Sequence, residues 1–256
     1  MLSVNRIYNK IKKPIKNIMG RVQYLVDCRN YNRLNTSDKF INKRKNRFPI
    51  YKDKYQDAGR IAEHYFLQDI YFSKIICQTR PKVHYDIGSR VEGFISHLLG
   101  SSCIEKVIML DIRPLPIEVE GLEFIQTDAT ELNEVDDRSL MSISSLHAIE
   151  HFGLGRYGDP IDPFAWKKVL KAIQKKLAVG GMFYLGIPVG REEKVCFNAH
   201  RIFNPYTIVE ELNELELVSF AYIHDSKIIK SNLDKNVTNL GEYDCGLFVF
   251  KREREN

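Results

Sequence analysis

Short apolar runs that alternate with helical stretches constrain this chain more than any other feature. From residue 56 onward, five such runs are bounded by turn residues, and helical stretches near 91–99 and 162–178 separate several of them. The runs are Val83–Ile87, Val107–Asp111, Leu122–Gln126, Leu140–Ser144 and Met182–Ile187. Strand, helix and strand in succession require right-handed crossovers, which build a mostly parallel sheet.

The C-terminal part completes this pattern. A helix near 205–214 precedes two further strands, Leu217–Ile223 and Cys245–Phe250, and Gly180-Gly181 is expected to cap the helix that ends near 178. The sequence therefore predicts the α/β class, with a Rossmann-like, doubly wound, seven-stranded and mostly parallel sheet whose last hairpin is antiparallel. Ligands of such sheets bind at the C-terminal strand ends.

The first 54 residues differ from the rest in charge. They carry 15 Lys or Arg and three acids, a net charge of +12, whereas the remainder carries 23 basic and 30 acidic residues, a net charge of −7. We therefore divide the chain into a basic, partly helical N-terminal arm, residues 1–55, and a domain of residues 56–256.

The arm has the spacing of an amphipathic helix with lysines between its apolar positions, which are Ile7, Ile11, Ile15, Ile18 and Val22. Pro14 should kink or restart this helix. Three interpretations stay open: a helix packed on its own domain, a helix in peripheral contact with an anionic membrane, and a nucleic-acid contact.

Acids at three successive strand ends indicate a cofactor. Asp86 and Gly88 follow the first strand, where glycine permits a tight turn and the next helix offers free N–H groups. Asp111 ends the second strand and can accept ribose hydroxyls, and Asp128 after the third can accept an adenine amino group. Without a pyrophosphate-binding glycine loop, this set favours S-adenosylmethionine, whose ammonium group suits Asp86, with S-adenosylhomocysteine as product. The expected cofactor-binding residues are Asp86, Gly88, Ser89, Arg90, Asp111, Ile112, Asp128, Ala129, Ser145 and His147.

The order of these features resembles the class I S-adenosylmethionine-dependent methyltransferases. A narrower resemblance, over residues 60–225, is to a bacterial methyltransferase-like family of the domain-of-unknown-function type found among surface-polysaccharide genes. It is carried by Tyr85–Arg90, Asp111–Leu115, Ser144–Pro160, Pro188–Gly190 and Phe197–Phe203. The resemblance implies the fold and the cofactor, but it gives no acceptor residues.

The residues needed on the acceptor side depend on the atom that receives the methyl group. A sugar hydroxyl needs a general base, whereas a phosphate-type oxygen needs only groups that hold the anion. The expected catalytic residues are His151, His200 and Glu150, and the expected substrate-binding residues are Arg156, Tyr157 and Arg201. These residues predict an O-methyltransferase for a polar small molecule or glycan precursor.

Other classes stay open. The string His147–His151 also matches the H-x-x-E-H zinc-peptidase signature, but it directly follows a strand and glycines follow it, so we expect no metal. A binding subunit without catalysis is an alternative. Nucleic-acid methylation is disfavoured because the domain is acidic. The five scattered cysteines predict reduced thiols and a cytoplasmic protein, at the inner face of the membrane if the arm binds there. The sequence predicts no oligomeric state.

Overall fold

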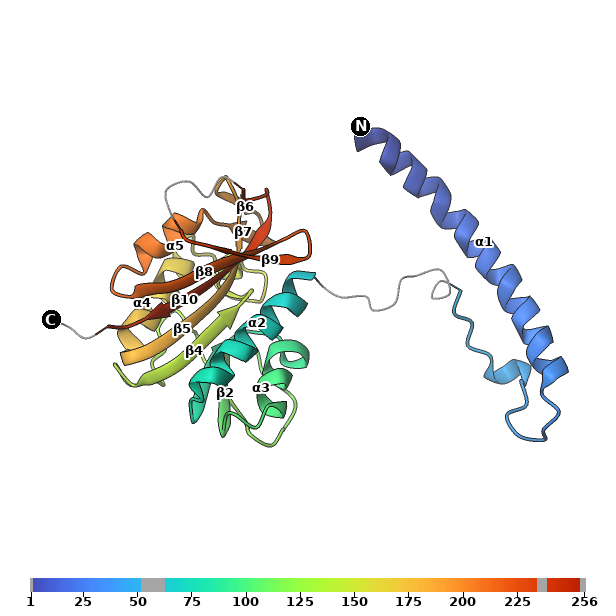
Figure 1. The fold of residues 1–256 in the computed structure, drawn as a ribbon, viewed down its shortest axis with the longest axis horizontal. Coiled ribbons are helices and arrows are strands. Elements are labelled where there is room, and N and C mark those ends of the chain that lie inside the picture. Colours follow the sequence, from blue (N-terminus) through green and yellow to red (C-terminus); the bar gives the residue numbers. More distant parts are fainter. Residues whose placement is uncertain (1, 52–62, 234–238, 254–256) are drawn as a thin grey trace. The chain divides into compact units, whose positions relative to one another are not determined.

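The computed structural model describes residues 2–51, 63–233 and 239–253, with side chains from residue 18 onward. The chain divides into two units, Met1–Arg60 and Ile61–Asn256, each of which is described by itself (Figure 1). The boundary expected between residues 55 and 56 lies outside the described residues.

The first unit contains one long helix, α1 (Leu2–Leu34), and a following segment with a short 3-10 turn, η1 (Arg44–Asn46). Helix α1 runs through Pro14 without interruption, so the expected restart at this proline is wrong. The side chains of Ile7, Ile11 and Ile15 lie outside the described residues. Within the described part of the chain, no helix is long and apolar enough to cross a bilayer.

The second unit is built on an eight-stranded sheet with the order β3-β2-β1-β4-β5-β10-β8-β9. Strands β1 to β5 pair in parallel, and β10 runs antiparallel to both β5 and β8. The strands are β1 (Val83–Ile87), β2 (Lys106–Asp111), β3 (Leu122–Gln126), β4 (Leu140–Leu146), β5 (Leu177–Val189), β8 (Glu216–His224), β9 (Lys227–Ser231) and β10 (Asp244–Lys251). The predicted doubly wound class is confirmed, with one strand more than expected.

The extra strand lies at the edge of the sheet. Strand β9 contains two lysines in five residues, so its apolar signal is weak. It joins β8 through Asp225 and Ser226, whose φ angles of 45° and 59° are those of a tight hairpin turn. A separate hairpin of β6 (Lys194–Cys196) and β7 (His200–Ile202) was also not predicted.

Helices cover both faces of the sheet (Figure 1). Helix α2 (Glu63–Thr79), the π-helical turn η3 (Val91–Ile95) and α3 (Ser96–Gly100) bury their apolar side chains in one cluster. Helices α4 (Ala165–Lys176) and α5 (Pro205–Glu211) bury theirs in a second cluster on the other face. This arrangement leaves the C-terminal ends of the parallel strands free to form a site.

Helix α4 ends earlier than the glycines predict. Its C-cap residue is Leu177, which also begins β5, so the expected cap at Gly180-Gly181 is wrong. Gly180 instead has a φ of +79° within β5 and donates its N–H to the carbonyl of Arg252 at 2.8 Å. Direct pairing of Leu177 with Leu140 of β4 starts the strand at that point.

Two of the five cysteines form a disulfide. Cys77 near the end of α2 and Cys103 before β2 have Cα atoms 5.4 Å apart. The expectation of reduced thiols is therefore wrong for this pair, whereas Cys28, Cys196 and Cys245 are free thiols. A separation of 26 residues along the chain carries no signal for such a pair, because only the packing of α2 against α3 brings the two cysteines together.

A chain of buried polar side chains ties β1 to β4. The ring of His84 contacts the hydroxyls of Ser142 and Ser144 at 2.7 and 2.8 Å. Ser144 in turn donates to the carboxylate of Asp86, which also accepts the N–H of Ser89 at 2.9 Å. Burial lowers the pKa of His84 to about 3 and raises the pKa of Asp86 to about 6. The ring of His84 is therefore neutral throughout the physiological range.

The buried ring of His84 predicts a dependence of stability on pH. Below pH 6.5 the unfolded chain protonates this histidine, whereas the folded chain excludes the proton down to about pH 3, so stability is lost as the pH falls through this window. The loss approaches about 1.4 kcal/mol per pH unit. In His84→Gln the amide does not titrate, so we expect urea unfolding of this variant to lose less stability between pH 6.5 and 5 than the wild type.

Asp86 and Asp69 act in the opposite direction, because burial raises the pKa of each to about 6 and acidification relieves their charge. The informative quantity is therefore the difference between the two proteins at each pH. His97→Gln, which removes an exposed histidine, is the matched control and should follow the wild-type curve. Parallel curves for wild type and His84→Gln would contradict the interpretation.

Candidate functional site

A cavity of about 290 Å³ lies at the C-terminal ends of β1 to β4. Each of these strands contributes a residue from the turn that follows it or from its own end: Gly88, Asp111, Asp128 and His147. Segment 152–162 closes the opposite side. The volume is near the lower end of the range of small-molecule sites, about 300–1,000 Å³.

Gly88 shapes the floor of the cavity. Its φ of +68° suits glycine, and a Cβ at this position would lie 3.0 Å from the Cβ of Ala148. Asp86, two residues earlier, is fully buried and does not line the cavity, because its carboxylate is held by Ser89 and Ser144. The expected direct contact between Asp86 and a ligand ammonium group is therefore not available; this acid instead fixes the turn that carries Gly88.

Asp111 presents its carboxylate at the end of β2, where Arg113 binds both of its oxygens. The Nε and Nη2 atoms of Arg113 lie 3.0 and 2.7 Å from Oδ1 and Oδ2 of Asp111. The guanidinium also lies over the ring of Tyr157, with 4.3 Å between its Cζ atom and the ring centroid. Arg113 thus competes with any hydroxyl group for the carboxylate of Asp111.

Segment 153–160 forms the outer wall of the cavity, and the carboxylate of Asp159 accepts hydrogen bonds from backbone N–H groups of this segment. Asp159 accepts the N–H of Gly153 at 2.7 Å and that of Tyr157 at 3.2 Å. Tyr157 then packs edge-on against His151, with 5.4 Å between ring centroids. Asp159 and Tyr157 both line the cavity.

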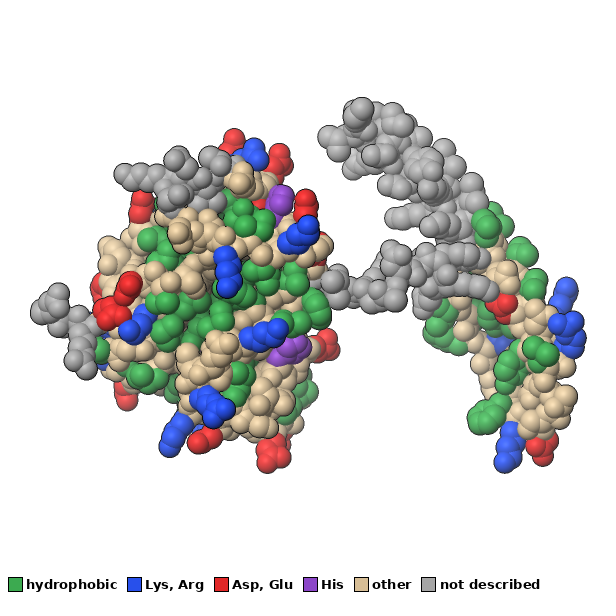
Figure 2. All heavy atoms as spheres, viewed as in Figure 1, with side chains coloured by type: hydrophobic (Ala, Val, Ile, Leu, Met, Phe, Trp, Pro, Cys, Tyr) green, Lys and Arg blue, Asp and Glu red, His purple; other side chains and the backbone are tan. Residues whose placement is uncertain are grey.

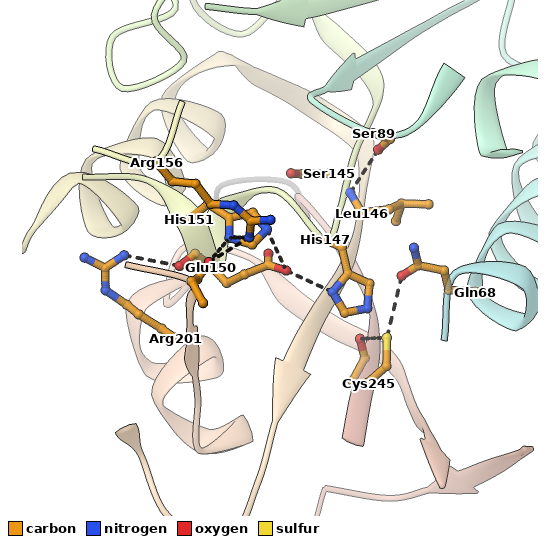
Figure 3. Close-up of polar contacts among 12 residues, drawn as sticks. Gln68, Ser89, Ser145, Leu146, His147, Glu150, His151, Arg156, Arg201 and Cys245 are labelled. Carbon is orange, nitrogen blue, oxygen red and sulfur yellow. Dashed lines mark hydrogen bonds and ion pairs between the residues drawn. The ribbon is translucent and has the colours of Figure 1, made fainter. Parts of the chain in front are cut away.

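Glu150 lies between two histidines (Figure 3). Its Oε1 atom is 2.9 Å from Nδ1 of His147 and 3.6 Å from Nε2 of His151. Burial opposes a charge on His147, but its contacts with Cys245 and Glu150 outweigh burial and raise its pKa well above the ordinary value. Nε2 of His147 and Oε2 of Glu150 are buried without a hydrogen-bond partner among the described residues.

His151 is held in one tautomer. Its Nδ1 atom lies 2.6 Å from the carbonyl oxygen of Ala199, which can only accept, so Nδ1 carries the proton and Nε2 carries the lone pair. Burial lowers the pKa of His151 and outweighs the opposing effect of Glu150. The ring is therefore neutral at pH 7, lines the cavity and can accept a proton at Nε2.

The remaining residues expected on the acceptor side, Glu150 among them, lie outside the cavity lining. Arg201 donates to the carbonyl of Phe152 at 2.6 Å and lies 3.4 Å from two further carbonyls, so its guanidinium is engaged with the backbone. Arg156 donates to the carbonyl of Ala199 at 3.0 Å. The ring of His200 packs against that of Tyr243, with 5.1 Å between ring centroids. These three residues fix the wall around His151 rather than face the cavity.

The expected cofactor residues divide in the same way. Six of them line the cavity: Gly88, Asp111, Ile112, Asp128, Ala129 and His147. Four do not: Asp86, Ser89, Arg90 and Ser145. Ser89 and Ser145 are buried, and their hydroxyls bond to Asp86 and to the carbonyl of Ile87. Arg90 lies over the ring of Tyr65, with 5.0 Å between its Cζ atom and the ring centroid.

Sequence reasoning missed an aromatic cluster behind His147. His64 and Tyr65 at the start of α2 lie 6.0 and 4.8 Å from the His147 ring, and Tyr243 before β10 lies 5.4 Å from His64. No local signal could reveal this cluster, since its members are up to 179 positions apart in the chain. Arg113, by contrast, stands two positions after Asp111 and could have been inferred as its partner.

The zinc-peptidase interpretation loses its geometric basis. His147 has a φ of +52° and precedes a single 3-10 turn, η4 (Ile149–His151), so the string is not on an α-helix. The Nδ1 atoms of its two histidines have separate partners, Glu150 and the carbonyl of Ala199. Within the described ranges, no group of three or more His, Cys, Asp or Glu residues could hold a metal ion.

Solved structures share this sheet. The crystal structure of 1,6-didemethyltoxoflavin-N1-methyltransferase from Burkholderia thailandensis, with 1,6-didemethyltoxoflavin and S-adenosylhomocysteine bound, is similar over 78% of this chain and 94% of its own, with a TM-score of 0.53 and 15% identity. The N-methyltransferase NodS from Bradyrhizobium japonicum WM9, in complex with S-adenosylhomocysteine, is similar over 77% and 90%, with a TM-score of 0.52 and 15% identity. This chain has the fold of the class I S-adenosylmethionine-dependent methyltransferases.

The methyltransferase fold does not by itself identify the reaction. The [4+2]-cyclase SpnF is similar over 72% of this chain and 82% of its own, with a TM-score of 0.52 and 9% identity. Residues 116–240, just under half of the chain, match a family described as "Caenorhabditis protein of unknown function, DUF268". That description names neither bacteria nor a polysaccharide. No curated protein matches the chain.

Gly153 gives a test of the outer wall. Its φ is +74°, and a Cβ there would lie 1.8 Å from the carbonyl oxygen of Asp162. Gly158, in the same segment, has a φ of +86°, but a Cβ there would have no atom within 4 Å. Both alanine variants carry backbone strain, whereas only Gly153→Ala adds a collision, which costs about 1–3 kcal/mol more. We expect Gly153→Ala to melt several degrees below Gly158→Ala in calorimetry.

Equal melting temperatures for these two variants would mean that the wall can shift away from Asp162. The segment would then not be a fixed wall of the cavity.

Proposed function

We propose that this chain is an S-adenosylmethionine-dependent methyltransferase that methylates an oxygen of a polar small molecule or glycan precursor. The observation that supports the proposal most is His151, a neutral histidine held in one tautomer in the wall of a cavity that Gly88, Asp111 and Asp128 also line. The sequence resemblance favours a precursor of a bacterial surface polysaccharide, with a sugar hydroxyl or phosphate-type oxygen as acceptor.

The residues of the cavity fit the cofactor. Gly88 leaves space that a Cβ would fill, and Asp111 offers two carboxylate oxygens, the group that binds a ribose diol in this kind of sheet. Ile112 and Ala129 supply apolar surface for a purine ring, and Asp128 supplies an acceptor for its amino group. Arg113 must release at least one oxygen of Asp111 for the ribose to bind.

When bound, S-adenosylmethionine supplies an activated methyl group for in-line transfer. The protein's own residues would hold the acceptor and remove its proton. Nε2 of His151 can take a hydroxyl proton, and Glu150, at 3.6 Å, stabilises the resulting imidazolium. Glu150 is 1% exposed and does not line the cavity, so it acts through His151 rather than on the acceptor itself. The neutral base His151 favours a hydroxyl acceptor over an anionic acceptor, which needs no base.

The alternatives make different demands. A binding subunit without catalysis would bind the cofactor but would need no proton acceptor such as His151. A nucleic-acid methyltransferase would need a basic surface beside the cavity, whereas the chain beyond residue 54 has a net charge of −7.

Cofactor binding is the first test. In isothermal titration calorimetry we expect the wild-type chain to bind S-adenosylmethionine and S-adenosylhomocysteine. Asp111→Ala removes hydrogen bonds to a charged group, worth about 1.5–3 kcal/mol, so affinity should fall about 10- to 100-fold. Arg113→Ala removes the competitor from Asp111; because the arginine side chain is 49% exposed, this ion pair is worth up to about 1 kcal/mol, and affinity should rise up to about fivefold.

This pair of substitutions acts on the same carboxylate in opposite directions. Unchanged cofactor affinity in Asp111→Ala would mean that the carboxylate at the end of β2 does not bind the ribose. Absence of cofactor binding to the wild type would contradict the methyltransferase proposal.

Turnover tests the role of His151. With a radiolabelled methyl group and a panel of nucleotide-linked sugars, sugar phosphates and amines, His151→Gln should lose about 10²–10⁴-fold in kcat. Cofactor affinity should stay within about threefold, because the amide still donates to Ala199. In the wild type, kcat/KM should fall on acidification through the lowered pKa of His151 and be flat above neutral pH, since only the neutral ring accepts a proton.

Product analysis decides between the acceptor classes. A methyl ether with a large effect of His151→Gln supports the sugar hydroxyl, whereas a methyl ester of a phosphate with little effect would show that no base is needed. N-methylation would contradict the oxygen acceptor. Binding of cofactor without any turnover on the panel would favour the binding subunit.

A further inference from the structure

Helix α1 exposes a row of large apolar side chains (Figure 2). Ile18, Met19, Val22, Leu25 and Val26 are 62, 55, 59, 55 and 40% exposed. At 3.6 residues per turn they fall within an arc of about 120° on one side of the helix. A stripe of this width is the face that an amphipathic helix normally buries.

The opposite side of the helix is already covered by its own unit. Gly20 is buried, and a Cβ there would lie 2.4 Å from the carbonyl oxygen of Tyr51. The rings of Tyr24 and Tyr51 pack edge-on at 5.7 Å, and the hydroxyl of Tyr31 donates to the carbonyl of Phe40 at 2.8 Å. The segment after α1 therefore takes one face and leaves the apolar stripe without a partner in this unit.

The charge of the helix identifies the kind of surface that fits it. Helix α1 carries eight Lys or Arg residues and one acid, Asp27. Arg21, Arg29 and Arg33 are exposed on the same described part of the helix as the stripe. An apolar stripe bordered by positive charge matches a bilayer with anionic headgroups, which offers hydrocarbon and negative charge on one surface.

Other partners use only half of these features. A second copy of the helix would bring like charges together along the stripe, which is unfavourable in a coiled coil. A nucleic acid would neutralise the basic residues but would leave the apolar stripe in water. A membrane span is excluded for this helix because its basic residues make it too polar.

We propose that α1 lies in the interface of an anionic membrane, with Ile18, Val22 and Leu25 inserted among the lipids and the basic residues at the headgroups. The helix is about 50 Å long, so it lies along the surface. This attachment would hold the second unit near the bilayer, and it does not depend on the methyltransferase proposal.

Vesicle binding of the full-length chain tests the proposal. Cosedimentation is compared between phosphatidylcholine vesicles and vesicles that contain about one third phosphatidylglycerol. We expect at least about tenfold tighter binding to the anionic vesicles, since each basic residue at the surface contributes to the attraction. Binding should weaken as salt rises from about 0.1 M to about 1 M, because the screening length falls from about 10 to about 3 Å.

Two variants separate the apolar from the electrostatic part. Ile18→Gln/Val22→Gln/Leu25→Gln keeps helix propensity but removes the stripe, and Arg21→Gln/Arg29→Gln/Arg33→Gln removes charge. Each should bind anionic vesicles at least about tenfold more weakly. Ile117→Gln/Val179→Gln/Val195→Gln is the matched control: these side chains are 49, 47 and 56% exposed in the second unit, and their loss should leave vesicle binding unchanged.

Each other partner has its own signature. Loss of thermal stability of the stripe variant without vesicles would mean that the stripe packs on the rest of the chain. Loss of a dimer in sedimentation velocity would identify a second copy. Binding to duplex RNA that depends on the arginines, with vesicle binding that ignores the stripe, would identify a nucleic acid. Any of these results, or equal binding to neutral and anionic vesicles, would overturn the proposal. Circular dichroism is used to check that the variants keep the helix.

Discussion

The cavity depends on the hydrogen bonds that the buried carboxylate of Asp86 accepts. This carboxylate accepts the N–H and hydroxyl of Ser89 and the hydroxyl of Ser144, and so joins the turn after β1 to the neighbouring strand β4. The hydroxyl of Ser89 then accepts the N–H of Leu146, at the end of β4. These bonds hold Gly88 in its left-handed conformation beside Ala148, which leaves the floor of the cavity open.

The pKa values of the two histidines beside Glu150 are set by burial and hydrogen bonding. Glu150 is 1% exposed and pairs with His147, and burial opposes a charge on that histidine whereas its contacts with Cys245 and Glu150 raise its pKa. His151 stays neutral because Ala199 accepts its Nδ1 proton and burial lowers its pKa. The pKa values of two histidines four residues apart are thus shifted in opposite directions, because one contacts a buried carboxylate and a thiol, whereas burial dominates at the other.

The two units separate two kinds of surface. The first unit carries basic residues and a row of exposed apolar side chains on one helix, whereas the second unit is acidic overall and packs two apolar clusters against the two faces of its sheet. Long-range attraction to an anionic surface therefore resides in the helix, and the acidic unit does not compete for that surface.

The sequence by itself determined the class of fold and the strand ends that form the cavity. Alternation of apolar runs with helical stretches is a local signal, and parallel strands must bring their C-terminal ends, here with Gly88, Asp111 and Asp128, to one edge of the sheet. Strand β9 escaped prediction because an edge strand with two lysines lacks that local signal.

Only the tertiary structure decided which of these side chains face the cavity. Asp86 turns inward because two serines satisfy it, and Arg201 turns away because backbone carbonyls accept its guanidinium. The disulfide between Cys77 and Cys103 and the ring cluster of His64, His147 and Tyr243 likewise depend on contacts between distant segments. Spacing along a chain fixes where a residue lies on a strand or helix, but the direction of a polar side chain depends on the partners that packing brings to it.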